Sequence, residues 1–392
     1  MRRYIKFAAI LFPAILFLIT SCDKKDESSP LSGYPYKGKS LHPQLDLSLL
    51  PDSDLYNLNK KVSKQTAEKL HAKAVSLIDS LKLTGMGISI LIPQEGLWKL
   101  DTGYRSTDKL KKVDSTSVFY WMNVGKMFTG SVITQLVQEK KLTYDDKLFN
   151  RFPEFQYAEQ ITIEQLLTHT SGIYSFDSDS ASGKDKPSYP ENELINLAIA
   201  HKNLFKPGEY WLFNNTGYLL LGSIAEKIEG KAFADIVADR ISGPLNLRSI
   251  KVITQGEVPE NPAFADYDGE VIKEEYAHGG AASISGNSAD MLKFLYFNLT
   301  GKLYSKSLIS SNLEQLYPMV DKGSFYGKGM MVWDFNEIDN TNHFWIGHYG
   351  GLYNYNAVVA YDTETKAFIA VSLNQKISAT AVANSLLAEL KK

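Results

Sequence analysis

The stretch that decides the fold is Phe119-Tyr120-Trp121-Met122-Asn123-Val124-Gly125-Lys126-Met127-Phe128-Thr129. From Lys126 to Lys140, apolar residues recur at helical spacing, which predicts that this stretch opens an amphipathic helix. Asn123 and Lys126 are three residues apart, so a helix places them on one face, one turn from each other. Asn is also a preferred N-cap residue, because its side chain can accept a hydrogen bond from an unpaired backbone N–H. The stretch therefore predicts an amide and a cation side by side at the start of a helix.

Regular elements surround this stretch on both sides. Residues 63–83 show helical periodicity, and residues 85–92 and 96–104 read as two strands joined by a turn. Near the other end, three β-rich runs (344–349, 355–361 and 367–373) precede a closing helix at 379–390. Between them, 118–291 is mostly helical with long loops, and Thr162 and Gly172 are candidates to start and end one of its helices. The pattern predicts an α+β fold, in which N- and C-terminal helices flank an antiparallel sheet and a mostly helical lobe is added.

Within this framework, residues 119–129 resemble the first active-site motif of the serine β-lactamase and penicillin-recognising enzyme family. The similarity is to the branch that contains class C β-lactamases, D-alanyl-D-alanine carboxypeptidases and esterases, where the motif reads Phe-x-x-x-Ser-x-x-Lys-x-Phe-Thr. This chain keeps Phe119, Lys126, Phe128 and Thr129, and has Asn123 where the family has its nucleophilic Ser. The resemblance extends over roughly residues 63–390 and implies the same sheet-and-helix fold for a domain spanning 59–392.

The departure at Asn123 affects the chemistry that the resemblance implies. The family needs a hydroxyl nucleophile, a neutral Lys whose pKa lies well below about 10.4, and two backbone N–H groups for the oxyanion. A carboxamide nitrogen delocalises its lone pair into the carbonyl, so Asn123 cannot form the ester intermediate. Loss of the nucleophilic Ser in a serine hydrolase lowers kcat by about 10⁶-fold. We therefore expect the inherited covalent route to be closed.

The second and third motifs resemble the family only in part. Within 205–218, this chain matches the family at Pro207, Gly208, Asn215, Gly217 and Tyr218, but the proton-handling Tyr is replaced by Phe213. The third motif, Gly347-His348-Tyr349-Gly350-Gly351, is intact. The resemblance implies that His348 faces a cleft and that the segment Tyr349-Gly350-Gly351 meets a ligand, with Gly350 allowing its backbone to approach the strand.

Two roles stay open from these motifs. His348 either faces the cleft or merely fills a strand position. Lys126 either lines a pocket as a hydrogen-bonded cation beside Asn123 and Asn215, or is simply tolerated there. Two coherent losses in separate motifs, at the nucleophile and at the Tyr, favour natural loss of activity over a single error.

The N-terminus predicts export and lipidation. Arg2 and Arg3 precede a short apolar run, which indicates a signal peptide over 1–21. Residues 18–22 resemble a bacterial lipobox, which implies cleavage before Cys22, lipidation of its sulfur, and a lipid anchor in the cell envelope, at the outer membrane of a Gram-negative bacterium. The alternative is an ordinary signal peptide with a chance Cys. Residues 25–27 resemble a surface-export signal, or they are simply charged. Residues 22–58 are rich in Pro and Gly and are predicted to form a tether.

Composition narrows the classes of function. The 392 residues are 44% hydrophobic and carry a formal net charge of −2 without a long basic block, so neither nucleic acid nor a polyanion is an expected partner. We expect a monomer that uses no cofactor and no metal.

Three hypotheses follow. The chain is a non-catalytic family member that binds a peptidoglycan-like or peptidyl ligand. Alternatively, it is an active β-lactamase, D-Ala-D-Ala carboxypeptidase or esterase with displaced chemistry, or it is a structural envelope lipoprotein.

Overall fold

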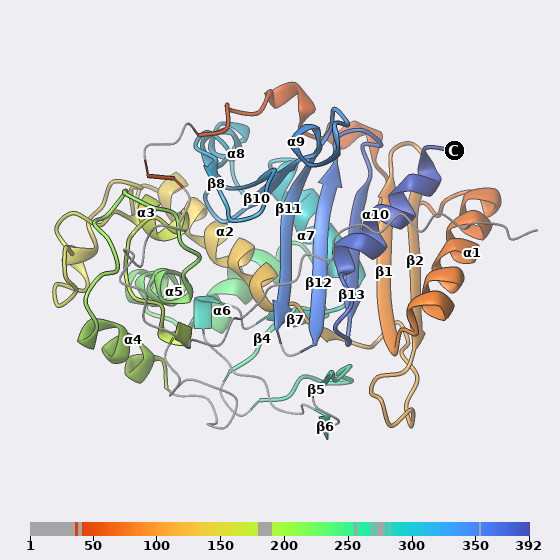
Figure 1. Ribbon diagram of the computed structural model, residues 1–392, viewed down its shortest axis with the longest axis horizontal. Helices are drawn as coiled ribbons and strands as arrows, with labels where there is room; N and C mark the ends of the chain where they lie inside the picture. Colours follow the sequence, from red (N-terminus) through yellow and green to blue (C-terminus); the bar gives the residue numbers. More distant parts are fainter. Residues whose placement is uncertain are drawn as a thin grey trace, which may run out of the picture. The chain divides into compact units, whose positions relative to one another are not determined.

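The computed structural model describes residues 36–37, 41–178, 190–254, 257–267, 270–271, 279–281, 284–352 and 354–392 (Figure 1). The predicted signal peptide, Cys22 and the first part of the predicted tether lie outside these ranges, as does most of the polar loop after Phe176. Within the described part of the chain, none of the helices combines the length and the hydropathy needed to cross a bilayer.

The centre of the domain is an eight-stranded sheet in which every neighbouring pair is antiparallel. The first hairpin and the last strands of the chain meet in it, since Met86 pairs with Leu373. Across the sheet the strands are β2 (Gly96–Gly103), β1 (Gly85–Ile92), β13 (Phe368–Leu373), β12 (Tyr355–Asp362), β11 (Phe344–Leu352), β10 (Met331–Asp334), β9 (Ser324–Tyr326) and β8 (Tyr317–Pro318). The predicted strands at both ends of the chain are confirmed, and β8 to β10 extend the sheet beyond them.

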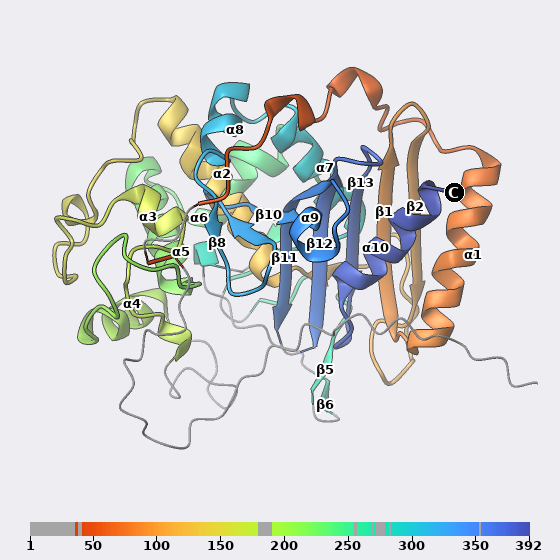
Figure 2. The same cartoon turned by 45° about the horizontal axis from the view of Figure 1, so that its top comes forward.

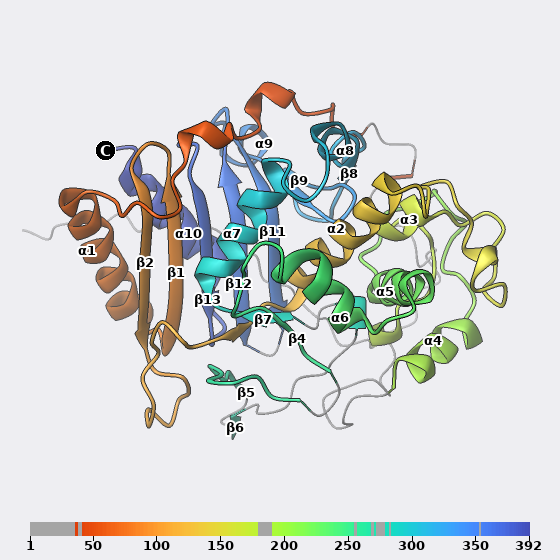
Figure 3. The same cartoon turned by 180° about the vertical axis from the view of Figure 1, so that it is seen from behind.

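Helices cover both faces of this sheet, which explains why β1 and β13 are buried at every position. On one face, α10 (Ala379–Leu390) packs on β12 and β13 and against α1 (Lys64–Leu81), as Figure 1 shows. On the opposite face, α7 (Ser288–Leu299) crosses β1, β13 and β12, as Figure 3 shows from behind. The fold is therefore the predicted antiparallel sheet flanked by N- and C-terminal helices.

The helical lobe adjoins the sheet through α2 (Gly125–Gln138), as Figure 2 shows. Nearly all residues of this helix are buried. A three-stranded sheet of β3 (Phe119–Tyr120), β7 (Ile284–Gly286) and β4 (Lys251–Val252) holds the start of this helix in place. The other helices of the lobe are α3 (Ile163–Leu167), α4 (Glu191–Ala200), α5 (Asn215–Glu229) and α6 (Phe233–Val237). The remaining elements are α8 (Lys306–Asn312), α9 (Phe335–Asp339) and the pair β5 (Asp266–Tyr267) and β6 (Glu270–Val271).

Residues 41–58, here called the strap, differ from the predicted tether. His42 bridges to Leu316, and Leu45 is only 5% exposed. Two 3₁₀ turns, Leu47–Leu49 and Ser53–Leu55, are capped by the side chains of Asp46 and Asp52. The strap therefore belongs to the folded domain, because its apolar side chains find core contacts even though its prolines prevent longer elements.

The helix predicted to run from Thr162 to Gly172 is also shorter than expected. Its start is confirmed by a capping box between Thr162 and Gln165, but α3 ends at Leu167. Gly172 instead supports a later turn, where it has φ +76° and a Cβ would lie 2.1 Å from the Phe205 carbonyl oxygen. The sequence correctly marks Gly172 as a special backbone position but not as the end of this helix.

Candidate functional site

Lys126 is the centre of the site, and its side chain is fully buried. Its Nζ donates to Asn123 Oδ1 at 2.9 Å, to Asn215 Oδ1 at 2.6 Å and to the Ala281 carbonyl oxygen at 2.6 Å. An ammonium group has three protons to donate, so these three acceptors match it completely. The predicted grouping of Lys126 with both Asn side chains is therefore what the structure contains.

The backbone around Asn123 explains its position. Residues Met122–Val124 form a 3₁₀ turn that leads into α2, and Met122 has φ +49°. For a non-glycine residue this conformation costs of order 1–3 kcal/mol, and such residues concentrate at functional sites. Asn123 is not the N-cap that its residue type favours; its side chain turns to Lys126, one turn along the chain.

The second motif places Phe213 and Asn215 on the other side of Lys126. Asn214 caps α5 by accepting from the Gly217 N–H, which fixes Asn215 as the first residue of that helix. The Phe213 ring centre lies 4.7 Å from Lys126 Nζ, so the ring offers the cation a π face where the family offers a hydroxyl. The substitution leaves a cation–π contact and no proton to exchange.

Asp177 is a site residue that the sequence gave no reason to choose. Asn215 donates through Nδ2 to Asp177 Oδ2 at 2.7 Å, and the Ser175 hydroxyl donates to the same carboxylate. The Asn215 backbone N–H in turn donates to Ser175 Oγ at 2.9 Å. Because Asp177 lies in a polar loop without a motif, only its place in the fold reveals the link to Lys126.

Two opposing effects set the protonation of Lys126. Burial lowers the pKa of Lys126 to about 7, while the Asp177 carboxylate acts in the opposite direction. The three oxygen acceptors also favour the ammonium, since the lone pair of a neutral amine would face an acceptor. In its protonated form Lys126 has no lone pair free to take a proton from a nucleophile, so this geometry suits a hydrogen-bonded cation rather than a general base.

His348 is placed near Lys126 but is 1% exposed and held by neighbours. Its Nδ1 donates to the Tyr349 carbonyl oxygen at 2.6 Å, and its Nε2 lies 3.0 Å from the Tyr326 hydroxyl oxygen. Burial lowers the pKa of His348 to about 3, with the Lys126 charge as a minor contribution in the same direction. His348 is therefore a neutral, hydrogen-bonded ring in a buried aromatic layer.

His169 belongs to the same layer. Its ring centre lies 4.7 Å from that of Phe213 and 4.5 Å from that of Tyr326. Nδ1 accepts from the Asn214 N–H, so the proton is on Nε2, which has no hydrogen-bond partner among the described residues. Burial, followed by the Lys126 charge, holds the pKa of His169 well below its usual range.

The glycines of the third motif meet the first motif directly. A Cβ on Gly350 would lie 2.2 Å from the Trp121 carbonyl oxygen and 2.7 Å from the Asn123 amide nitrogen. Glycine is therefore required for β11 to approach the backbone at Asn123. Gly351 pairs with Asn356 of β12, and the half-buried Tyr349 ring lies beside Trp333 of β10, with 6.5 Å between ring centres. The structure thus brings Gly350 to the site, while the Tyr349 ring packs elsewhere.

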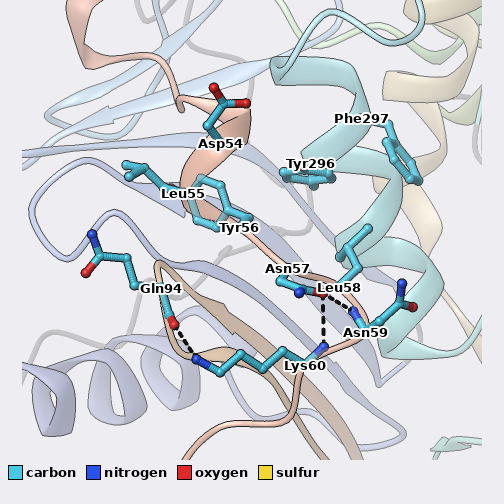
Figure 4. A pocket seen from close by; sticks show the side chains of 10 residues that line it. All are labelled: Asp54, Leu55, Tyr56, Asn57, Leu58, Asn59, Lys60, Gln94, Tyr296 and Phe297. Carbon is cyan, nitrogen blue, oxygen red and sulfur yellow. Dashed lines mark hydrogen bonds between the residues drawn. The ribbon is translucent and has the colours of Figure 1, made fainter.

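A separate surface cavity of about 570 Å³ lies where the strap crosses α7 (Figure 4). It is lined by strap residues and the two residues after them, by the turn between β1 and β2, and by two aromatic residues of α7: Asp54, Leu55, Tyr56, Asn57, Leu58, Asn59, Lys60, Gln94, Tyr296 and Phe297. Lys60 spans one side and donates to the Gln94 carbonyl oxygen at 2.8 Å. None of the motif residues lines this cavity.

Comparisons with known proteins agree with the fold. The Beta-lactamase family model matches residues 67–391. Penicillin-binding protein 4* of Bacillus subtilis is 30% identical over 161 residues, which are 40% of this chain and 36% of that protein. Teichoic acid D-alanine hydrolase of Staphylococcus aureus is 24% identical over 319 residues, 74% of this chain and 77% of that protein.

A solved structure shares the whole architecture. D-amino acid amidase from Ochrobactrum anthropi superimposes with a TM-score of 0.75 at 20% identity, covering 84% of this chain and 99% of the amidase. At this identity the likeness concerns the fold. The chain spans about a third of the first curated relative and about three quarters of the second.

Proposed function

Since this chain belongs to the β-lactamase family, we propose that it is a non-catalytic member that binds a cell-wall-like or peptidyl ligand at the Lys126 site. The observation that carries the proposal is the use of all three Lys126 protons, one of them by the amide that replaces the nucleophile. Phe213 supports it further, because a phenyl ring cannot pass a proton. The coarser assignment, a β-lactamase-like serine hydrolase family, is given by the family match.

The ligand class that we favour carries a D-amino-acyl group. Two relatives are named for D-amino-acid chemistry, as a teichoic acid D-alanine hydrolase and a D-amino acid amidase. In this chain the Asn123 carboxamide directs its oxygen to Lys126, so its NH₂ group is the donor that remains for a ligand carbonyl. The positive charge of the protonated Lys126 beside it favours a carboxylate or carbonyl nearby.

We further propose that the protein acts as a monomer, held at the cell envelope by a lipid on Cys22 and exposed to its ligand there. The support is the sequence pattern at residues 18–22, which lies outside the described residues. Mass spectrometry of the mature N-terminus after expression in a lipoprotein-processing host tests it. Diacylated Cys22 is the expected result, and an unmodified Cys22 or a different cleavage site would contradict it.

Calorimetric titration with an N-acyl-D-Ala-D-Ala peptide, followed by chromatography of the same samples, tests the binding function. We expect saturable binding without hydrolysis, weaker binding of the L-Ala-L-Ala peptide, and loss of binding in Lys126→Met. Lys328→Met is the matched control, because Lys328 is also buried but pairs with Glu164, at 2.6 Å, and with the Ser311 carbonyl oxygen.

Hydrolysis of the D-peptide by the wild type that disappears in Lys126→Met would instead establish the displaced-chemistry alternative. Absence of binding to either peptide would remove the ligand class proposed here.

A further inference from the structure

A second cluster of ionisable side chains lies at the end of the sheet where β12 and β13 are joined, beside α9. His343 precedes β11, Asp362 ends β12, and Glu364 lies in the turn that follows. One ring nitrogen of His343 and one oxygen from each carboxylate lie within 4.8 Å of one another. We propose that these three side chains form a binding site for a divalent transition metal of the Zn²⁺ class.

The ring of His343 and the two carboxylates are close to one another but not hydrogen-bonded. His343 Nδ1 lies 3.5 Å from Glu364 Oε2, and Nε2 lies 3.9 Å from Asp362 Oδ1. Both gaps are too long for good hydrogen bonds. Two ligands about 2.1 Å from a tetrahedral zinc ion are themselves about 3.4 Å apart, so the Nδ1–Oε2 separation already matches an edge of such a site. The third ligand atom, one Asp362 oxygen, lies within 4.8 Å of the other two.

His343 itself is buried and incompletely hydrogen-bonded. The side chain is 5% exposed, and its Nδ1 has no hydrogen-bond partner among the residues that the structure describes. A buried polar atom without a partner costs free energy, typically 1–3 kcal/mol. A metal ion bound at Nδ1 would remove that cost. The Phe335 ring stacks flat on the imidazole, with 4.2 Å between ring centres, so it does not block the in-plane direction of the Nδ1 lone pair.

The cluster is acidic, and its backbone is held in place on both sides. Two carboxylates share this cluster, and Lys391 already pairs with Glu364 as a cation, from the end of the chain. The backbone is fixed on both sides, since the Thr363 N–H donates to the Phe344 carbonyl oxygen at 2.9 Å and the Thr365 hydroxyl donates to Asp362 at 2.6 Å. Glu364 is about half exposed, so an ion can enter from solvent and complete its coordination with water. Zinc takes both imidazole nitrogens and carboxylate oxygens as ligands, so this donor set fits it.

Equilibrium dialysis of the full-length, untagged, chelator-treated protein against Zn²⁺ tests the site. We expect one ion per chain and a higher melting temperature, with binding weakened at least 10-fold in His343→Gln and in Glu364→Gln. His71→Gln, at an exposed position on α1, is the matched control and keeps wild-type binding. Lys391→Met leaves the three ligands intact, so it should bind zinc more tightly because the competing cation is gone.

The proposal would be overturned if the wild type bound no zinc, or if His343→Gln bound zinc as tightly as the wild type. Weaker binding in Lys391→Met would also contradict it, and this variant keeps the test valid if a ligand variant fails to fold. The Lys126 site plays no part in these measurements, so the outcome is independent of the proposed function.

Discussion

The Lys126 site and the His343 cluster both bury ionisable side chains, but they differ in how well the polar atoms are matched. Around Lys126 the donor–acceptor distances are 2.6–2.9 Å, and every proton of the ammonium has an oxygen. Around His343 the corresponding gaps are 3.5 and 3.9 Å, and one ring nitrogen has no partner among the described residues. A fully matched cluster has no donor or acceptor left for another ion, whereas a loosely spaced one leaves room for a further cation.

The largest expected effect concerns the two histidines beside Lys126. His348 has a pKa of about 3 in the folded protein and 6.5 as the ordinary value, so it binds fewer protons when folded. The free energy of unfolding should therefore fall as the pH decreases from 6.5 towards 3, by roughly 3 kcal/mol between pH 7 and pH 4 at about 1.4 kcal/mol per unit. His169 contributes in the same direction.

Urea unfolding at pH 7 and pH 4 measures this loss, and His348→Gln should show a smaller one. A pH dependence that is identical in wild type and His348→Gln would mean that His348 is not buried as a neutral ring.

The next effect concerns Lys126 itself. Its pKa is about 7 when folded and 10.5 as the ordinary value, so the unfolded chain binds more protons between these values. The free energy of unfolding should rise with pH from about 7 towards 10.5, by roughly 3–4 kcal/mol between pH 7 and pH 10. Lys126→Met should remove this rise, whereas the matched Lys328→Met should keep it. Equal slopes in both variants would contradict the burial of Lys126 as a titrating cation.

A smaller effect should follow from Asp177→Asn. The Asp177 carboxylate raises the pKa of Lys126, so its removal should shift the rise in stability to lower pH, by less than about one unit because Asp177 is solvent-exposed. Asp79→Asn on the exposed face of α1 is the control and should cause no shift. A shift to higher pH in Asp177→Asn would show that the Asp177 carboxylate does not raise the pKa of Lys126, and so would contradict this prediction.

Periodicity was enough to predict the long elements of the fold. The alternating and buried runs of β1, β12 and β13 and the helical spacing of α10 are local signals, and the structure confirms them. Strands β8 to β10 are only two to four residues long, and Gly327 and Gly329 lie in the connection between β9 and β10, so no run is long enough to show a period. The strap was predicted as a tether because its prolines are visible in the sequence, whereas the core contacts that hold it are visible only in the folded chain.

The candidate site was predictable only where a motif carries it. Lys126 and Asn215 stand in short motifs, and Gly350 follows His348 at fixed spacing, so a resemblance could bring them together. Asp177 and Tyr326 reach the same site from segments without a motif, through contacts that depend on the folded chain. Their roles could not be read from residue types alone.

The central claim is that Asn123 and the fully hydrogen-bonded Lys126 close the covalent route of the family. Intact-mass spectrometry after incubation with benzylpenicillin tests it most directly, with the double variant Asn123→Ser, Phe213→Tyr as the positive comparison. We predict no mass gain in the wild type and an acyl adduct, or turnover, in the double variant. A stoichiometric acyl adduct on the wild-type protein would contradict the account.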